Sequence, residues 1–251
     1  MLMARVNRSH CKLKENKMET IRIDKMLSNA CNISRSEIKR FIKRGEVTVN
    51  GKIIKTADEK IDPENSEVQL KGQTVGYNKF VYIMLNKPKG ILSASNDKNR
   101  KTVVDLVPEE MKRQKLFPVG RLDKDTTGLI IITNDGEYAH KIISPKNKTG
   151  KVYIATLDGE LETNLIGEFE KGVVLADGTR CRPAKLEILE SNVARLTLFD
   201  GKYHEVKRMF GVFNLGVNEL HRQAIGNLVL PKTLESGNCK LMSDEDVKKT
   251  L

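Results

Sequence analysis

The pattern of apolar and polar positions divides the chain into a short first part and a longer second part. Residues 19–76 have the pattern of two helices and a few short strands, and residues 75–79 show no periodicity and are predicted to be a linker. From Phe80 onward, β-type runs outnumber helical ones. We therefore expect two domains, at 19–76 and 77–251.

The first domain begins with two predicted helices. Apolar residues at helical spacing mark the first of them, at Ile23, Met26, Leu27 and Ala30. Ser34 and Glu37 form a Ser-x-x-Glu capping box at the start of the second helix, and Gly45 ends it. The apolar side of the second helix consists of Ile38, Phe41 and Ile42.

A β-hairpin is predicted after the second helix. Val47-Thr48-Val49 leads through Asn50-Gly51 into Lys52-Ile53-Ile54. Asn-Gly between two β-type runs is a strong signal for a two-residue hairpin turn. Another strand is predicted over residues 68–70.

In the second domain, strands and helices do not alternate as they do in a doubly wound fold. Apolar runs predict strands at 80–85, 129–133, 151–157, 185–190 and 193–199. Helical patterns occur at 102–113, 136–143, 161–171 and 204–214. The fold class expected is therefore α+β, with a mixed, largely antiparallel sheet in the second domain.

The chain is strongly basic, and its first part is the more basic per residue. The formal net charge is +11, from 44 Lys and Arg against 33 Asp and Glu. Residues 1–76 hold 16 Lys and Arg against 10 Asp and Glu, whereas residues 77–251 hold 28 against 23. A positive net charge favours a polyanionic partner, and nucleic acid is the commonest one.

Residues 1–18 carry basic side chains without a periodic apolar pattern. The basic residues are Arg5, Arg8, Lys12, Lys14 and Lys17, opposed only by Glu15. Two interpretations fit equally well: a disordered basic tail, or a start assigned upstream of Met18, which directly precedes the patterned segment. A transit peptide is disfavoured because the segment has no amphipathic apolar face.

Cysteine spacing and hydropathy bear on the compartment. The four cysteines, Cys11, Cys31, Cys181 and Cys239, lie far apart, so no pair has the close spacing of a zinc knuckle or a redox motif. No apolar run approaches the roughly 20 residues of a membrane span, and the N-terminus lacks the apolar core of a secretory signal. We expect a cytoplasmic monomer with no membrane partner.

The second predicted helix carries much of the positive charge of the first domain. Its basic residues are Arg35, Lys39, Arg40, Lys43 and Arg44, which suit either a solvated face or a nucleic-acid contact. The order of helix, basic helix and hairpin with Val-Thr-Val-Asn-Gly resembles the ribosomal protein S4-type RNA-binding domain. The resemblance covers nearly all of residues 19–76 and implies that the basic helix binds RNA phosphates and shape.

The most informative segment of the chain lies at residues 117–136. A short loop holds Arg121, Asp123 and Asp125, and the continuous apolar run Leu129–Ile132 follows it. Such a run predicts a buried strand. Asp123 therefore lies where a loop enters a buried strand, which is a common position for a functional carboxylate.

Three segments of the second domain occur in the order typical of RNA pseudouridine synthases. They are the Gly-Arg-Leu-Asp loop at 120–123, Lys151-Val152-Tyr153 at the start of a predicted strand, and 201–210, which runs from a turn into a predicted helix. Two more segments are similar to the RsuA type, which modifies small-subunit (16S) rRNA: Leu85-Asn86-Lys87-Pro88-Lys89-Gly90 and Leu220-His221-Arg222. The resemblance covers roughly residues 19–235, both domains included.

The resemblance implies the reaction and the residues that carry it. A pseudouridine synthase breaks the N-glycosidic bond of a uridine, rotates the base and rejoins it through carbon. This chemistry requires a carboxylate as nucleophile or base, but no metal and no organic cofactor. Asp123 matches the catalytic position, Tyr153 matches the aromatic residue that stacks on the flipped-out base, and Lys207 matches the basic residue that pairs with the carboxylate.

The resemblance also implies contacts to the substrate RNA from the second domain. They are expected at Arg121, Lys151 and Arg208. Asp125 is expected instead to cap the turn Thr126-Thr127-Gly128 through backbone hydrogen bonds. The four histidines form no ligand pair at helical spacing, so no metal site is predicted.

Three alternative functions fit parts of the sequence. Residues 123–127 match the Asp-x-Asp-x-Thr loop of haloacid-dehalogenase-type phosphohydrolases, but in that family the buried strand precedes the first Asp instead of following it. A non-catalytic RNA-binding ribosome assembly factor would have no need to retain Asp123, Tyr153 and Lys207. A large-subunit rRNA target is the third alternative, although Tyr203-His204 and residues 220–222 favour the small-subunit type.

Overall fold

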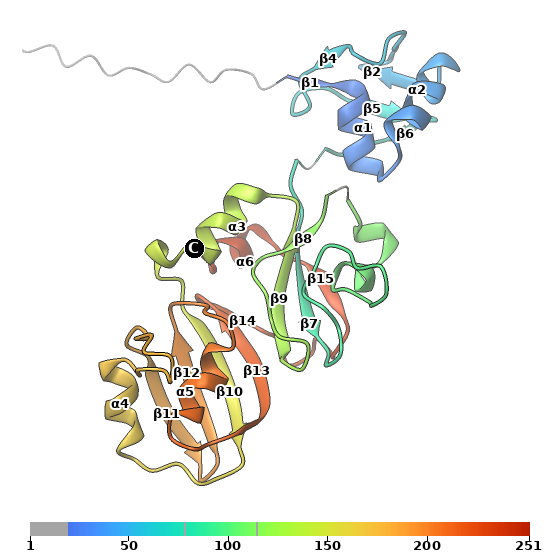
Figure 1. The fold of residues 1–251 in the computed structure, drawn as a ribbon. Coiled ribbons are helices and arrows are strands. Elements are labelled where there is room, and N and C mark those ends of the chain that lie inside the picture. The colour runs from blue at the N-terminus through green and yellow to red at the C-terminus, as the bar shows by residue number, and fades with distance from the viewer. Residues whose placement is uncertain (1–19, 78, 114) are drawn as a thin grey trace, which may run out of the picture. The chain divides into compact units, whose positions relative to one another are not determined.

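The computed structural model describes residues 20–77, 79–113 and 115–251 (Figure 1). The chain separates into two compact units that divide between Tyr77 and Asn78. The expected tail at residues 1–18 lies outside the described residues. Among the helices that are described, none is both long and apolar enough to cross a membrane.

The first unit packs two helices against short antiparallel strands. Its helices are α1 (Ile23–Cys31) and α2 (Arg35–Lys43). The strands β2 (Val47–Val49), β3 (Lys52–Ile53), β5 (Val68–Leu70) and β6 (Gln73–Thr74) form a sheet in the order β3-β2-β5-β6, and β1 (Ile21–Arg22) pairs with β4 (Lys60–Ile61).

The start and end of α2 follow from the residues that the sequence places there. Ser34 Oγ accepts a hydrogen bond from the Glu37 backbone N–H at 3.3 Å, which satisfies one of the free donors of the first turn. Gly45 adopts a φ of +73°, a conformation that ends the helix at little steric cost. The apolar side of α2, with Ile38 and Ile42, is buried in the core of the unit, and its basic side remains outside.

The second unit is built on one nine-stranded mixed sheet. Its main path runs β11-β12-β10-β13-β9-β7-β15, with β14 beside β13 and β8 beside β9. The strands are β7 (Tyr82–Lys87), β8 (Phe117–Pro118), β9 (Thr127–Thr133), β10 (Lys151–Leu157), β11 (Lys185–Glu190), β12 (Val193–Leu198), β13 (Val217–Ile225), β14 (Leu228–Val229) and β15 (Cys239–Leu241). All strand pairs are antiparallel except β9 with β13.

The parallel pair of β9 and β13 forms a short seam between two antiparallel halves of the sheet. Only Thr127 and Gly128 of β9 pair with His221 and Arg222 of β13. Gly128 has a φ of +102°, and a Cβ atom at this position would lie 2.3 Å from the Arg222 carbonyl oxygen. The two backbones therefore approach each other at a distance that only glycine permits.

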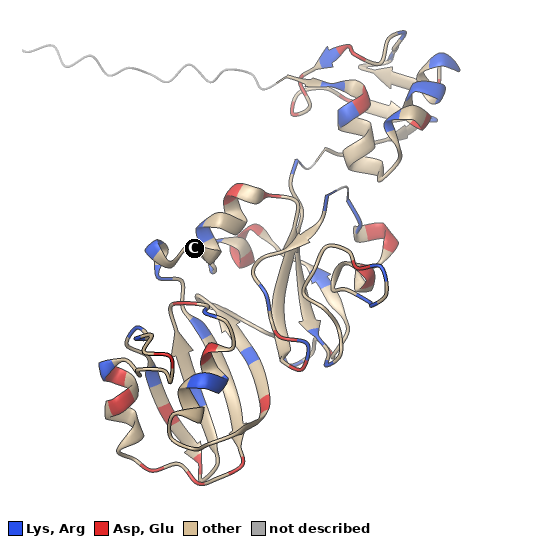
Figure 2. Ribbon diagram, viewed as in Figure 1, with Lys and Arg blue, Asp and Glu red and all other residues tan. Residues whose placement is uncertain are grey.

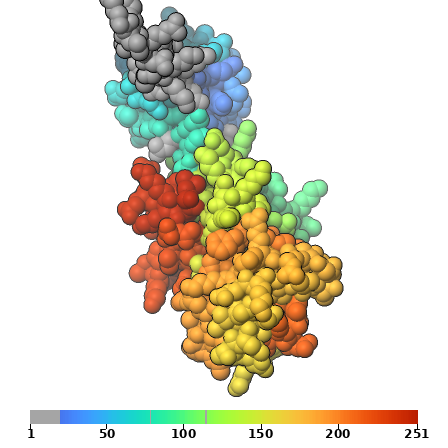
Figure 3. All heavy atoms as spheres, turned by 90° about the vertical axis from the view of Figure 1, so that its left-hand side faces the viewer, coloured from blue at the N-terminus to red at the C-terminus, as the bar shows by residue number. Residues whose placement is uncertain are grey.

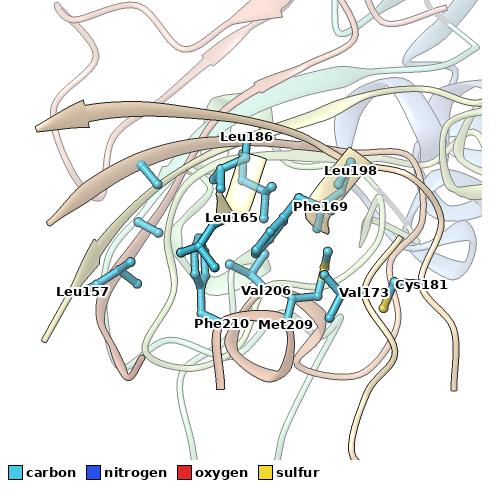
Figure 4. Packing of buried hydrophobic residues seen from close by; sticks show 14 of the residues in the cluster. Leu157, Leu165, Phe169, Val173, Cys181, Leu186, Leu198, Val206, Met209 and Phe210 are labelled. Atoms are coloured by element: carbon cyan, nitrogen blue, oxygen red, sulfur yellow. The ribbon is translucent and has the colours of Figure 1, made fainter. Parts of the chain in front are cut away.

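The half of the sheet formed by β10 to β13 packs against two helices. Helices α4 (Leu165–Lys171) and α5 (Glu205–Gly211) supply Phe169 and Phe210, whose ring centroids lie 5.0 Å apart. Figure 4 shows these aromatic rings between α5 and the overlying strands, together with Leu165 and Val206. This core holds α5 in a fixed position relative to β10.

The other half, around β7 and β9, is covered on both faces. Helices α3 (Gly136–Ile143) and α6 (Asp244–Lys248) contribute Tyr138 and Val247 to one face, and the segment around Val103 and Val107 packs on the opposite face. Leu129–Ile132 is therefore buried on both sides, as a continuous apolar run requires. The C-terminal residues lie beside α3 (Figure 3), where the Tyr138 and Thr250 hydroxyls are 2.7 Å apart.

The structure confirms the α+β class and corrects three predicted helices. The helix predicted at 102–113 is wrong: two 3₁₀ turns, Val104–Leu106 and Glu109–Met111, occupy this segment because Pro108 holds Val107 in an extended conformation. The helices predicted at 161–171 and 204–214 are shorter, as α4 and α5. Strand β13 was not predicted from the sequence, because its exposed polar residues obscure the alternation of apolar and polar positions that marks a strand.

We predict that Gly128→Ala destabilises the protein by about 3 kcal/mol or more, because the new methyl group would clash with rigid backbone in a positive-φ conformation. Gly167→Ala is the matched control: this glycine lies within α4, and nothing lies within 4 Å of a Cβ there. The control should be neutral or stabilising by up to about 1 kcal/mol. Urea unfolding followed by circular dichroism measures both, and equal stabilities would contradict the seam described above.

Candidate active site

A buried lysine forms hydrogen bonds to the backbone of the loop between β8 and β9. Lys87, the last residue of β7, is fully buried. Its ammonium group donates to the carbonyl oxygens of Pro88, Asp123, Lys124 and Thr126 at 2.8–3.2 Å. Since three of these carbonyls belong to the loop, the lysine fixes the loop backbone through a charge-assisted network.

Hydrogen bonds from Ser93 and Gly90 also hold the backbone of this loop. Ser93 Oγ donates to the Leu122 carbonyl at 2.8 Å and accepts from the Leu122 N–H at 3.0 Å. The Gly90 N–H donates to the Lys124 carbonyl at 2.8 Å. The backbone of the loop is therefore held by hydrogen bonds within the protein, while the Asp123 side chain is 31% exposed.

Asp123 and Tyr153 line one pocket together with residues of α5. Tyr153 comes from β10, and further lining residues include Leu220 of β13 and His204 and Lys207 of the α5 region. The elements that carry these side chains meet at the seam between β9 and β13, because β10 is the other neighbour of β13. Arg121 also lines this pocket, and its side chain is exposed.

His204 is the basic residue nearest to the Asp123 carboxylate. Its Nε2 lies 3.5 Å from Asp123 Oδ1. The imidazole is stacked on Tyr203 with ring centroids 3.8 Å apart, and Tyr203 is itself 76% exposed. His204 has a φ of +49°, a left-handed conformation that is uncommon for a non-glycine residue and is often found at functional sites.

The structure corrects two expectations about Lys207 and Asp125. Lys207 was expected beside Asp123, but its Nζ forms a 2.6 Å ion pair with Asp125 Oδ2. This hydrogen-bonded ammonium holds the pKa of Asp125 below its usual range. Asp125 was expected to cap the turn at 126–128, but its carboxylate instead reaches α5. The reason is geometric: His204 and Lys207 lie one helical turn apart and face alternate residues of the loop, Asp123 and Asp125.

The other basic residues predicted in the second domain differ in their surroundings. Lys151 is largely buried at the start of β10, where burial lowers the pKa of its ammonium. Arg208 forms an ion pair with Asp177. No described carboxylate lies within ion-pair distance of Arg121 or Lys151.

The basic side chains on α2 divide into two kinds. Arg35 bonds the carboxylate of Asp24, which is fully buried, at 2.5 Å, so it anchors α2 to α1. Lys39, Arg40 and Lys43 are exposed and form no ion pair with any described residue, and Arg44 lies 3.7 Å from Glu46. Figure 2 shows the Lys and Arg residues along α2. The free basic surface of this unit is therefore narrower than the five residues predicted from the sequence.

Among the described residues, no group of three or more His, Cys, Asp or Glu side chains has the arrangement of a metal site. His221 instead lies with Nδ1 2.9 Å from Thr127 Oγ1, and burial lowers its pKa. The chemistry available in the pocket is therefore that of a carboxylate, an imidazole, a phenol and a lysine, arranged around a partly exposed cavity.

The structural roles of three residues in this region were not predicted from the sequence. Lys87 and Arg222 were found only as parts of motifs, and His204 only as a mark of the subtype. A charged residue at the end of an apolar strand, as in Tyr82–Lys87, was the available signal for a buried lysine. His204 contacts Asp123 from a left-handed backbone conformation, which no sequence pattern indicated.

The second unit matches a known family of RNA-modifying enzymes. Residues 81–211 match the family model described as RNA pseudouridylate synthase, and residues 21–67 match the S4 domain. The first match covers the Asp123 loop, Tyr153 and α5. The second covers both helices of the first unit and its hairpin.

Full-length relatives extend over both units. The chain is 39% identical over 231 residues to an uncharacterised RNA pseudouridine synthase of Bacillus subtilis, covering 90% of this chain and 97% of the relative. It is 39% identical to a protein named ribosomal small subunit pseudouridine synthase A in Vibrio parahaemolyticus, covering 90% and 98% of the two chains. A solved structure described as a pseudouridylate synthase is 33% identical, with a TM-score of 0.65 over 92% of this chain and all of that one.

We predict that Lys87→Met lowers the free energy of unfolding by about 2–4 kcal/mol, because the loop carbonyls lose their shared donor. Burial lowers the pKa of Lys87 to about 8. A lowered lysine pKa means that the unfolded chain binds the proton more tightly, so stability should rise with pH between about 8 and 10.5.

The difference between wild type and Lys87→Met isolates this titration, since every other group is common to both proteins. The stability difference should be larger at pH 9.5 than at pH 7 by roughly 1–2 kcal/mol. Urea unfolding at the two pH values measures it. A difference that stays constant or shrinks with pH would show that the ammonium is not disfavoured by its burial.

Proposed function

The chain belongs to the RNA pseudouridylate synthase family, and from this premise we propose that it isomerises a uridine of small-subunit (16S) ribosomal RNA to pseudouridine, in the cytoplasm and as a monomer. The observation that carries the proposal is the pocket that Asp123 and Tyr153 line together, at the seam of the sheet.

The reaction is redox-neutral and conserves all atoms of the nucleotide. The bond between N1 and C1′ breaks, the base rotates, and a bond between C5 and C1′ forms, while N1 gains a proton and C5 loses one. Asp123 is proposed as the carboxylate that acts as nucleophile or as base on the ribose. Its side chain faces the pocket, while the carbonyls around it are occupied by Lys87.

The target base has to leave its stack before it can reach this pocket. We propose that Tyr153 stacks on the flipped base, an interaction worth about 1–3 kcal/mol. Arg121, exposed at the same pocket, is proposed to bind the flipped nucleotide or its phosphate. Lys207 is proposed to act through Asp125, by holding α5 against the loop that carries Asp123.

The S4 unit is proposed to supply affinity and placement. Its exposed basic residues on α2 suit contacts to RNA phosphates, which are electrostatic and largely independent of sequence. Lys151 and Arg208 are proposed as further RNA contacts in the second unit. The relatives named ribosomal small subunit pseudouridine synthase A support small-subunit rRNA as the target.

We predict that the wild-type protein forms pseudouridine at a uridine of a small-subunit rRNA transcript and not in a large-subunit transcript. Asp123→Asn should reduce the single-turnover rate by about 10⁴-fold or more, because it removes the ionised carboxylate with little change in volume. RNA affinity should stay nearly unchanged. Chemical mapping of pseudouridine by primer extension measures the product, and filter binding measures the affinity.

Asp58→Asn provides the matched control for this experiment, since Asp58 is an exposed aspartate in the first unit. It should leave the rate unchanged. An Asp123→Asn protein with a near-normal rate would remove Asp123 from the chemistry. If pseudouridine formed only in the large-subunit transcript, the proposed substrate would be wrong, but the assignment as an isomerase would still hold.

We predict that replacing Lys39, Arg40, Lys43 and Arg44 together with Gln weakens rRNA binding and lowers its dependence on salt. Each lost phosphate contact should remove about one unit from the slope of log affinity against log salt concentration. The single-turnover rate at saturating RNA should fall much less, since uniform binding is lost and not transition-state stabilisation. Arg35 is left unchanged because it anchors the buried Asp24.

The matched control replaces Lys25, Lys52, Lys55 and Lys60 with Gln, which removes the same charge from exposed positions of the same unit outside α2. Affinity should be measured at several salt concentrations for both variants. Equal slopes for the two variants would mean that α2 has only a general electrostatic effect. A selective loss of the saturated rate would mean that the first unit contributes to the active site.

A further inference from the structure

A second, larger cavity adjoins the pocket that contains Asp123. Its volume is about 850 Å³, which is within the range of sites that bind small molecules. Five residues line both spaces: Arg121, Tyr153, Asp200, Gly201 and Lys202. These residues, Tyr153 and Arg121 among them, therefore lie at the boundary between the two spaces.

The cavity contains more basic side chains than its acidic side chain can balance. Asp200 is the one carboxylate among its lining residues, and it is already paired: Lys202 Nζ lies 2.6 Å from Oδ2, and Arg182 Nε lies 3.0 Å from Oδ1. Lys151 and Arg222 also line the cavity, and no described carboxylate forms an ion pair with either of them. Neither cation therefore has an ion-pair partner of its own, and Asp200 and Glu205 act on Lys151 only from beyond ion-pair distance.

Arg222 has, in addition, an unused hydrogen-bond donor. The residue is 4% exposed, and its Nε donates to the Leu129 carbonyl at 2.7 Å. Its Nη2 is buried and has no acceptor among the described residues. An unpaired donor of a buried charged group is costly, and in native proteins such a group calls for an explanation, of which a bound water or anion is one.

The two cations lie on one face of the sheet, around Tyr153. Arg222 of β13 is the register partner of Tyr153, and Lys151 precedes Tyr153 by two residues on β10. Burial lowers the pKa of Lys151, and the neighbouring guanidinium of Arg222 lowers it further. An anion at this position would relieve both the charge repulsion and the unpaired donor.

Part of the lining of the cavity is apolar. Phe117, Pro118, Ile142, Ile143 and Pro145 form it. Ile143, at the end of α3, is 47% exposed, which is high for a large apolar side chain. A cavity lined by both cations and apolar side chains offers contacts to the two parts of a nucleotide, its phosphate and its base.

We propose that this cavity binds the nucleotide next to the target uridine, with its phosphodiester on Lys151 and Arg222 and its unstacked base on the wall around Phe117 and Ile143. The proposal rests on the proposed function, because it takes the uridine to occupy the adjoining Asp123 pocket. It implies that the enzyme reads a dinucleotide of unpaired RNA, and that Tyr153 separates two flipped-out bases.

The test compares the binding of UMP with that of the dinucleotides ApU and UpA. Isothermal titration calorimetry should give at least about tenfold tighter binding for one dinucleotide than for UMP, and the stronger one shows on which side of the uridine the cavity lies. In protein labelled at isoleucine methyl groups, that dinucleotide and not UMP should shift the NMR signal of Ile143. Equal affinities for UMP and both dinucleotides, or no dinucleotide binding at millimolar concentration, would overturn the proposal.

Variants locate the effect in the cavity. Lys151→Met and Arg222→Lys should each weaken binding of the preferred dinucleotide by about tenfold, because each variant disturbs a cation that holds the phosphodiester. Since Arg222 is buried and its variant could misfold, Ile143→Glu is the second test: it places a negative charge at an exposed position of the wall and should abolish the gain of the dinucleotide over UMP. Leu189→Glu, at an exposed position on β11 outside the cavity, is the matched control and should keep the gain.

The two proposals fail in different ways. If Ile143→Glu and Leu189→Glu bind the dinucleotide equally well, the cavity does not hold the neighbouring nucleotide, whatever the enzyme does to the uridine. If wild type forms no pseudouridine in either rRNA transcript, the proposed function is wrong even where the dinucleotide binds.

Discussion

The close approach of β9 and β13 is the constraint on which the second unit depends. Without a side chain at Gly128, the backbone of β9 lies against that of Arg222, and the Arg222 guanidinium bonds back to Leu129. This contact joins two antiparallel halves that have separate hydrophobic cores. The loop with Asp123 enters the sheet on one side of the seam, and Tyr153 and α5 belong to the other side, so the seam sets the distance between them.

Rigidity of the Asp123 loop comes from charge buried beneath it. A lysine in a protein interior is costly unless its donors are satisfied, and Lys87 meets this requirement with carbonyl groups of the loop. The arrangement places a positive charge under the loop without placing a competing partner on the Asp123 carboxylate. Lys87 thus both stabilises the loop and positions the Asp123 carboxylate.

Much of the fold could be predicted because local patterns and tertiary packing agree. The helices at α2 and α3, the hairpin at Asn50-Gly51 and the strands β10 and β11 follow from capping residues, turn residues and apolar periodicity. Prediction failed where one residue or distant contacts decide the structure. Pro108 breaks a helical pattern into two turns, and β13 becomes a strand because it fills the space between β9 and β10. The motifs brought Asp123, Tyr153 and Lys207 to one pocket, whereas the partner of Lys207 depends on the phase of α5 relative to the loop.

That phase has a consequence for how the chain can vary. His204 contacts Asp123 and Lys207 contacts Asp125. The two basic residues are three positions apart and the two carboxylates two positions apart, so both contacts form only in one register of α5 against the loop. Removing one residue from the start of α5 would rotate the following side chains by about 100° and turn Lys207 away from Asp125. Insertions and deletions in either segment are therefore not independent, and a length change in the loop can be accommodated only together with a compensating change ahead of α5.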